Sequence, residues 1–214
     1  MKVIRETILI DLKTDLERLW SRIDKNLRTD VRKAKKSGVT LKISREQGDI
    51  DACFEIFLKL NKKYLTPVLK EHNFKLTNSS ELLCAVYNNQ IISFILVELS
   101  NIAGKNNPRF KYAATNDSYK QLNPVSFLYW EAIARYNARG YEFLDLGGSD
   151  YSTNDPQLIR LKEYKEKWNG LKQVHVSNES FFAWFYIRHL RKFLLLKKIK
   201  YFILTNFSNK YLKY

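Results

Sequence analysis

The sequence predicts a mixed α/β domain, in which a mostly antiparallel sheet carries helices on both of its faces. Two observations predict this fold class: the expected order of elements, β-α-β-α-β-β-β-α-β-α-β, and a central pair of strands joined by a short turn. The composition agrees, because 45% of the 214 residues are apolar and 14% are aromatic, enough for a buried core. We expect this domain over residues 1–176 and a helical tail over residues 177–214.

The first third of the chain predicts strand, helix, strand and helix. Residues 2–12 alternate apolar and polar side chains, as a half-buried strand does. Residues 14–36 predict one long helix that ends before Gly38, with an apolar face and an opposite basic face. The basic face consists of Arg18, Arg22, Lys25, Arg28, Arg32 and Lys36. Residues 39–43 alternate again as a strand, and residues 49–64 predict a second helix.

The remainder of the domain begins with a predicted hairpin. Two apolar strands, residues 82–87 and 91–98, flank a turn formed by Asn88, Asn89 and Gln90. We expect a polar loop over residues 101–108 before the next strand. The further expected elements are a strand over 109–115, a helix that Pro124 opens and Gly140 ends, a strand over 141–146, a helix over 156–168 and a strand over 171–176.

The composition excludes several classes of site and location. Cys53 and Cys84 each have apolar neighbours and predict two small buried side chains, and two cysteines exclude a disulfide framework. The three histidines are widely spaced, so no metal site is expected. The first residues are too polar for a signal peptide, and no apolar stretch approaches the roughly 18 residues of a membrane span. We therefore expect a cytoplasmic protein, either free or peripheral on the inner face of the membrane.

Positive charge is concentrated in the C-terminal tail. The formal net charge is +15, and residues 181–214 hold eight basic residues, no acid and many aromatic residues. This interleaving suits an anionic membrane surface or a nucleic-acid contact. A pair of C-terminal helices packed on the domain, with basic residues outward, fits the same pattern.

Two segments carry residues suited to chemistry. A strand ends at Asp145 and runs into Gly147-Gly148, where the backbone can approach a ligand closely, although a tight turn explains the glycines as well. On the following helix Lys162 and Lys165 share a face, and such a lysine can hold a phosphate or a developing oxyanion. A solvated lysine is the simpler alternative. The sequence shows no Ser/His/Asp or Cys/His signature, so no covalent intermediate is indicated.

These two segments together resemble the end of the Fem-type aminoacyltransferase domain (the FemAB family). This family belongs to the GNAT acyltransferase superfamily and builds peptidoglycan interpeptide bridges. The matching residues are Asp145-Leu146-Gly147-Gly148 and then Tyr164-Lys165-Glu166-Lys167-Trp168, with Asn169 where the family has glycine and Gly170 one place later. Asn26–Val39 resembles the family's Arg-x-x-Ile-Arg-Lys-Ala-x-x-x-Gly-Val segment, and Asn123–Ile133 its Pro…Leu-x-Trp-Glu-Ala-Ile helix. The resemblance covers roughly residues 7–176 and one domain, the more C-terminal of the two that members carry.

The resemblance implies a GNAT-like fold and the transfer of an aminoacyl or acyl group to an amine of a cell-envelope precursor, with a lipid-linked one as a candidate. GNAT acetyltransferases hold coenzyme A with an Arg/Gln-x-x-Gly-x-Gly/Ala loop before a helix N-terminus. Residues 119–123, before the helix at Pro124, contain no glycine. This difference favours aminoacyl-tRNA over acyl-CoA as the donor, and no tightly bound cofactor is expected.

The same resemblance assigns roles to individual residues. Lys165 matches the functional lysine of the family and is expected to stabilise charge, while Asp145 is a candidate for handling the proton or a strand-end cap. Arg28 and Arg32 are candidates for binding acceptor phosphates. Further substrate-binding residues are expected at Tyr164, Trp168, Gly147, Gly148 and Trp130. Two alternatives remain: a CoA-dependent N-acyltransferase acting on an amino sugar, and a non-catalytic domain that binds RNA or anionic membrane.

Overall fold

The computed structural model describes residues 2–61, 76–102, 105–150 and 155–178. Residues Ile4–His175 form one compact unit, which contains the described helices and strands apart from the outer ends of the first and last strands. Met1–Val3 and Val176–Tyr214 belong to a second unit. The predicted tail lies outside the described residues from position 179 onward, so the tail and the boundary at residue 176 stay predictions.

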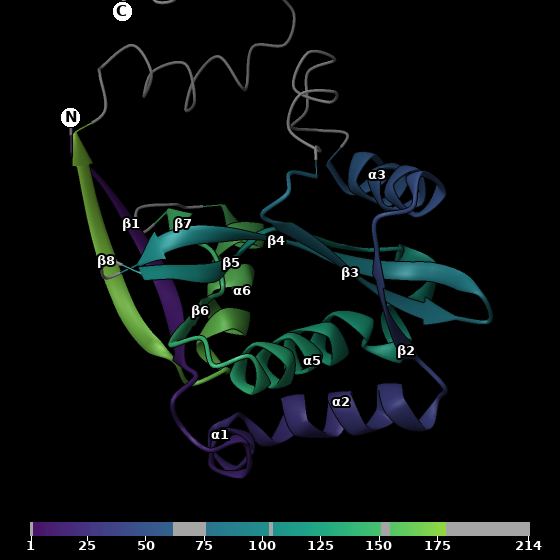
Figure 1. Cartoon of the computed structure of the whole chain (residues 1–214), viewed down its shortest axis with the longest axis horizontal. Helices are drawn as coiled ribbons and strands as arrows, with labels where there is room; N and C mark the ends of the chain where they lie inside the picture. Colours follow the sequence, from purple (N-terminus) through teal and green to yellow (C-terminus); the bar gives the residue numbers. More distant parts are fainter. Residues whose placement is uncertain (1, 62–75, 103–104, 151–154, 179–214) are drawn as a thin grey trace, which may run out of the picture. The chain divides into compact units, whose positions relative to one another are not determined.

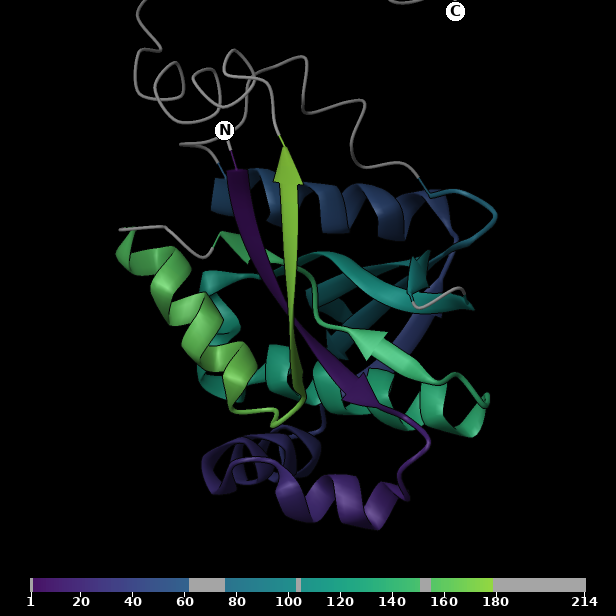
Figure 2. The ribbon, with the colours of Figure 1, turned by 90° about the vertical axis from the view of Figure 1, so that its left-hand side faces the viewer.

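The centre of the fold is an eight-stranded sheet in the order β2-β3-β4-β5-β6-β1-β7, with β8 paired to β1 (Figures 1 and 2). Neighbouring strands from β2 to β5 are antiparallel, as are the pairs of β1 with β6 and with β7. β5 and β6 run parallel and meet at one pair, Arg109 and Asp145. The strands are β1 (Lys2–Asp11), β2 (Thr40–Ser44), β3 (Ser80–Tyr87), β4 (Gln90–Ile102), β5 (Lys105–Thr115), β6 (Phe143–Asp145), β7 (Ser149–Asp150) and β8 (Leu171–Asn178). The predicted fold class is confirmed.

Helices cover both faces of this sheet. Figure 1 shows α3 on one face and α2 and α5 on the other. The helices are α1 (Leu16–Arg22), α2 (Lys25–Lys36), α3 (Gln47–Asn61), α5 (Pro124–Ala138) and α6 (Pro156–Glu166), with a 3₁₀ helix, η1 (Asp117–Leu122), before α5. A large core joins α1, α2 and α5 to the sheet, and a smaller core lies under α3. Cys53 and Cys84 are fully buried in the smaller core, as the sequence predicted.

The predicted long helix over residues 14–36 is wrong in one respect, because the chain breaks it into α1 and α2. Ile23 adopts an extended conformation and is buried, and Asp24 caps α2 by accepting the amide of Asn26 at 2.8 Å. The end of α6 holds this break, since the amide of Asp24 donates to the carbonyl of Lys167 and Asn169 donates to that of Arg22. The basic face is therefore divided between two helices rather than forming one stripe.

The predicted polar loop over residues 101–108 is also wrong. β4 and β5 continue as one ladder, with Leu99 opposite Pro108 and Ile102 opposite Lys105. One polar residue of this segment, Asn107, is buried, and its Oδ1 accepts the amide of Phe143 at 3.0 Å. The side chain thus satisfies a backbone group where β5 and β6 barely pair. The 3₁₀ helix η1 and the short strand β7 were not predicted.

Two residues after α6 explain how this chain departs from the Fem-type glycine pattern. Asn169 takes a left-handed conformation (φ +54°), which asparagine tolerates better than most residues. At Gly170 a Cβ would lie 2.6 Å from both Ile8 Cγ2 and the carbonyl of Leu9. Only a glycine fits against β1 at position 170, so the turn brings the end of α6 back onto the sheet.

Candidate active site

A buried lysine is the central feature of the candidate site. Lys165, in the last turn of α6, is 6% exposed, and its Nζ donates a hydrogen bond to the carbonyl of Gly147 at 2.8 Å. Burial lowers the pKa of Lys165 from its ordinary 10.5 to about 8; the carboxylate of Asp145 opposes this shift and Arg109 adds to it. A partly desolvated ammonium group beside a glycine turn differs from the solvated lysine that was the simpler alternative.

Asp145 organises the turn that Lys165 contacts. Its Oδ1 accepts the amide of Gly147 at 2.8 Å and a short hydrogen bond from the hydroxyl of Thr7. Its Oδ2 lies 3.3 Å from the Nε of Arg109. Both carboxylate oxygens therefore have partners, and the strand-end capping that the sequence offered as an alternative is present. The predicted role in proton handling stays a prediction.

Gly147 is required by the shape of this turn. Its φ is +80°, and a Cβ there would lie 2.7 Å from the carbonyl oxygen of Phe110 and 3.7 Å from Lys165 Nζ. Gly148 is exposed, and a Cβ there would meet nothing closer than 3.7 Å. The two predicted glycines thus serve differently: Gly147 allows the turn to form, whereas Gly148 keeps it open to solvent.

Three polar residues of the site were missed from the sequence. Arg109 reaches Asp145 from β5, Thr7 reaches it from β1, and Glu6, 4% exposed, lies 3.3 Å from Lys162. None belongs to a recognisable motif, because β1, β5 and β6 become neighbours only when the sheet forms. The pattern along β1 offered one signal, since the adjacent polar residues Glu6 and Thr7 interrupt the alternation of apolar and polar side chains.

Tyr164 and Trp168 pack behind Lys165. Trp168 is 2% exposed and stacks on Tyr129, with ring centroids 5.3 Å apart. The hydroxyl of Tyr164 lies 3.0 Å from that of Ser126, and burial raises the pKa of Tyr164. Both rings fix the position of α6 against α5, which places Lys165. Their predicted contact with substrate stays a prediction.

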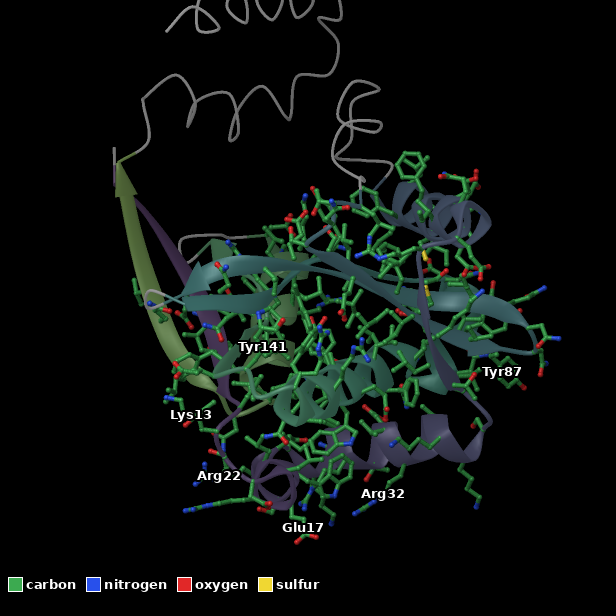
Figure 3. The ribbon with its side chains drawn as sticks, in the orientation of Figure 1. Lys13, Glu17, Arg22, Arg32, Tyr87 and Tyr141 are labelled. Atoms are coloured by element: carbon green, nitrogen blue, oxygen red, sulfur yellow. The ribbon has the colours of Figure 1, made fainter. Side chains whose placement is uncertain are left out.

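The other predicted residues lie elsewhere in the fold. Trp130 packs on Trp20 with ring centroids 4.5 Å apart, and the Arg32 guanidinium lies over Trp20 at 5.4 Å. Figure 3 shows Arg32 on the outer side of α2, pointing away from the sheet. Arg28 is half-buried on the same helix. Among the described residues, no hydrogen bond, ion pair or ring contact joins this group directly to Lys165 and Asp145.

The N-terminus of α5 is where a GNAT acetyltransferase would hold a pyrophosphate. Here Asn123 occupies the cap position with φ +53°, and its side chain donates to the Asp30 carboxylate at 2.9 Å instead of capping the helix. The next residue, Pro124, has no amide hydrogen to offer. A carboxylate thus lies beside the helix end that would otherwise attract an anion.

The described residues contain neither a metal-binding cluster nor a membrane-spanning helix. Within those ranges no three His, Cys, Asp or Glu side chains gather as a metal site would require. Over the same residues no helix has the length and apolar character needed to cross a bilayer.

Comparison with known proteins bears on the whole arrangement. A family model described as an acetyltransferase (GNAT) domain matches residues 81–166, which include Asp145, both glycines and Lys165. No curated protein matches the chain significantly. The solved structure of FemX matches with a TM-score of 0.62 and 12% identity, over 86% of this chain and 63% of FemX. L-PGS from Bacillus licheniformis matches with a TM-score of 0.61 and 11% identity, over 87% and 65%.

A third structure is the C-terminal domain (DUF2156) of a protein described as a lysylphosphatidylglycerol synthetase, from Agrobacterium fabrum. It matches with a TM-score of 0.55 and 15% identity, over 82% of this chain and 60% of that one. This chain therefore spans about three fifths to two thirds of the length of these structures. At such identities the likeness concerns the fold. Residues 81–166 are thus similar to a GNAT acetyltransferase domain, and the chain shares its fold with FemX and L-PGS.

Proposed function

We propose that this domain transfers an aminoacyl group from aminoacyl-tRNA to an amine of a cell-envelope precursor. The observation that carries the proposal is the Lys165 ammonium group, buried and bonded to the carbonyl of Gly147. In the reaction the amine attacks the ester carbonyl, a tetrahedral oxyanion forms, and the tRNA hydroxyl leaves with a proton. Lys165 stabilises the oxyanion, since a preformed cation in a poorly solvated site interacts strongly with developing negative charge.

Asp145 and the glycine turn act through Lys165. Asp145 holds the amide of Gly147, and the carbonyl of the same residue fixes the Lys165 amine. Because both oxygens of Asp145 already have partners, we assign it a positioning role; handling the amine proton requires one of these partners to leave. This arrangement orients the lysine before substrate arrives, which reduces the cost of reorganisation during the reaction.

Three features support aminoacyl-tRNA as the donor. The Asp30 carboxylate and Pro124 make the N-terminus of α5 a poor pyrophosphate site. The chain shares its fold with FemX and L-PGS, and its sequence resembles the Fem-type aminoacyltransferases. The outer faces of α1 and α2 expose basic side chains suited to phosphates, namely Arg18, Arg22, Lys25, Arg32, Lys33 and Lys36.

The donor is tested by comparing tRNA and coenzyme A as ligands of the purified chain. We expect total tRNA to be retained on filters, with affinity that falls steeply as salt rises, because each phosphate contact releases counterions. Calorimetry with acetyl-CoA is expected to show no binding. Tight acetyl-CoA binding that salt does not affect, without tRNA retention, would contradict this donor. It would favour the second candidate, a CoA-dependent N-acyltransferase acting on an amino sugar, which the acetyltransferase family model supports.

The rate of transfer should depend on pH through Lys165. The pKa of its ammonium group is about 8, so the cation is present below pH 8 and is lost as pH rises through that value. The Lys165→Arg variant retains its positive charge at alkaline pH. Protonation of the acceptor amine affects both proteins equally, so it cancels in the ratio of their activities. We expect the ratio of wild-type to Lys165→Arg activity to fall as pH rises through about 8. A ratio that rises over the same interval would indicate that the neutral amine acts as a base.

Attachment to a membrane surface is a separate proposal that rests on the sequence of residues 181–214 alone. Each basic residue near an anionic surface contributes about 1 kcal/mol, so eight suffice to hold the chain there. Sedimentation with anionic vesicles tests this, since full-length protein should sediment and a chain ending at residue 180 should not. A truncated chain that folds and still binds equally would assign the attachment to other basic residues.

A further inference from the structure

Arg109 has one part of its side chain fixed and the rest open to solvent. Its Nε lies 3.3 Å from Asp145, whose side chain is 6% exposed, whereas the Arg109 side chain is 48% exposed. Within the described part of the chain, the guanidinium of Arg109 forms its ion pair with Asp145. Since the contact uses the Nε edge, the terminal nitrogens are held in a defined direction and remain available to another group.

The exposed end of Arg109 lies against the glycine turn. A Cβ at Gly148 would come within 3.9 Å of Arg109 Nη2, and one at Gly147 within 3.7 Å of Lys165 Nζ. One buried cation and one half-exposed cation therefore flank the two glycines. The absence of a side chain at Gly148 leaves the surface beside Nη2 open.

The side chains that the structure describes near this turn carry more positive than negative charge. Lys162 and Lys172 lie within 4 Å of the carboxylate of Glu6, so the negative charge of Glu6 is paired with these two lysines. Asp145 faces both Arg109 and Lys165, and the positive charge of Arg109 lowers the pKa of Lys165. Two cations thus share one carboxylate within the described residues. An additional anion beside Arg109 would relieve their repulsion.

We propose that Arg109 and the Gly147-Gly148 turn form a subsite for an oxyanion group, a phosphate or a carboxylate, carried by a substrate. The planar guanidinium binds such groups through two parallel hydrogen bonds, and its attachment to Asp145 sets its orientation in advance. This inference deepens the proposed function, on which it rests for the identity of the substrate, because the anion would lie beside the lysine assigned to the reacting ester. The subsite itself is open to test without any transfer reaction.

Inorganic pyrophosphate serves as the first probe, with its binding measured by calorimetry at low salt. Arg109→Gln should weaken binding about tenfold or more, the usual effect of losing a hydrogen bond to a charged group. Arg109→Lys keeps the charge beside Asp145 but loses the fork, and should give an intermediate loss. Lys111→Gln is the matched control, because Lys111 is a basic residue on the same strand, paired with Glu98 at 2.6 Å. It should bind as the wild type does.

Two outcomes would overturn the subsite: equal pyrophosphate affinity in the wild type, Arg109→Gln and Lys111→Gln, or no detectable binding by the wild type. Thermal unfolding of each variant establishes whether the chain is folded. If Arg109→Gln is not folded, Arg109→Lys takes its place in the comparison. Either result is independent of whether tRNA is the donor.

Binding of tRNA then identifies the source of the anion. If Arg109 contacts a tRNA phosphate, the slope of log affinity against log salt should become shallower by about 0.7–0.9 in Arg109→Gln, and not in Lys111→Gln. An unchanged slope assigns the anion to the acceptor. If pyrophosphate binds through Arg109 but the wild type retains no tRNA, the subsite stands and the proposed donor fails.

Discussion

Replacement of Lys165 by alanine is expected to lower the rate of aminoacyl transfer about a hundredfold or more. The ammonium group is the described cation best placed to meet a developing oxyanion beside Gly147, and loss of one such group costs on that order. The rate is measured with labelled aminoacyl-tRNA and acceptor under saturating conditions. Lys167→Ala, on the exposed side of the same helix end, is the control and should change the rate little.

The fold should survive the loss of this amine. The shift of the Lys165 pKa from 10.5 to about 8 corresponds to about 3 kcal/mol against the buried cation at neutral pH. Losing the hydrogen bond from this charged group to Gly147 costs about 1.5–3 kcal/mol in return. Lys165→Met, which preserves side-chain volume, should therefore be inactive yet melt at or above the wild-type temperature. A small and equal effect of Lys165→Ala and Lys167→Ala on transfer would show that Lys165 has no part in the chemistry.

Gly147→Ala is expected to lower the free energy of unfolding by about 2–4 kcal/mol. A left-handed conformation costs an alanine about 1–2 kcal/mol, and the new Cβ overlaps the carbonyl of Phe110 at 2.7 Å, where backbone cannot move aside cheaply. Any adjustment of the turn also displaces the carbonyl that holds Lys165, so activity should fall as well. Urea denaturation monitored by tryptophan fluorescence gives the free energy.

Gly148→Ala is the matched control for this substitution. Its Cβ would meet the carbonyl of Glu6 at 3.7 Å and Arg109 Nη2 at 3.9 Å, both ordinary contacts. We expect a change in stability within about 0.5 kcal/mol, as for most surface substitutions. Equal stability losses in the two variants would mean that Gly147 does not adopt a left-handed conformation against the carbonyl of Phe110.

The sequence predicted the sheet and its helices because periodicity and turn residues act locally. The Asn88-Asn89 hairpin turn, for example, has both residues at positive φ, and β3 and β4 pair across it. The helix break at Asp24 was missed, since its cause is a contact with the end of α6, more than a hundred residues away. The strand over residues 105–108 was missed because its side chains are polar, which is typical of a loop. Its pairing with β4 depends on backbone hydrogen bonds, which leave no pattern in the sequence.

In the candidate site, too, the residues that belong to local motifs were predicted, and those brought in by strand pairing were missed. Lys165, Asp145 and the two glycines belong to motifs on consecutive segments, and the structure places them together. Arg109 and Thr7 belong to no motif and reach Asp145 only through the pairing of β5 and β1 with β6. Arg28, Arg32 and Trp130 also lie in matching segments, yet Arg32 and Trp130 pack on Trp20, and Arg28 lies on α2 with no hydrogen bond or ion pair to Lys165 within the described residues. The order of motifs along the sequence indicates which segments the site contains. The pairing of the strands determines which side chains of those segments come into contact.

Direct titration of the Lys165 amine by NMR tests the central claim without requiring a substrate. The signal is assigned by its absence from Lys165→Arg, and its chemical shift is followed from neutral to alkaline pH. The buried ammonium group should titrate near pH 8, and its midpoint should move upward in Arg109→Gln, because a neighbouring positive charge is removed. A midpoint near 10.5, the same in both proteins, would show a solvated lysine and contradict the role assigned to this residue.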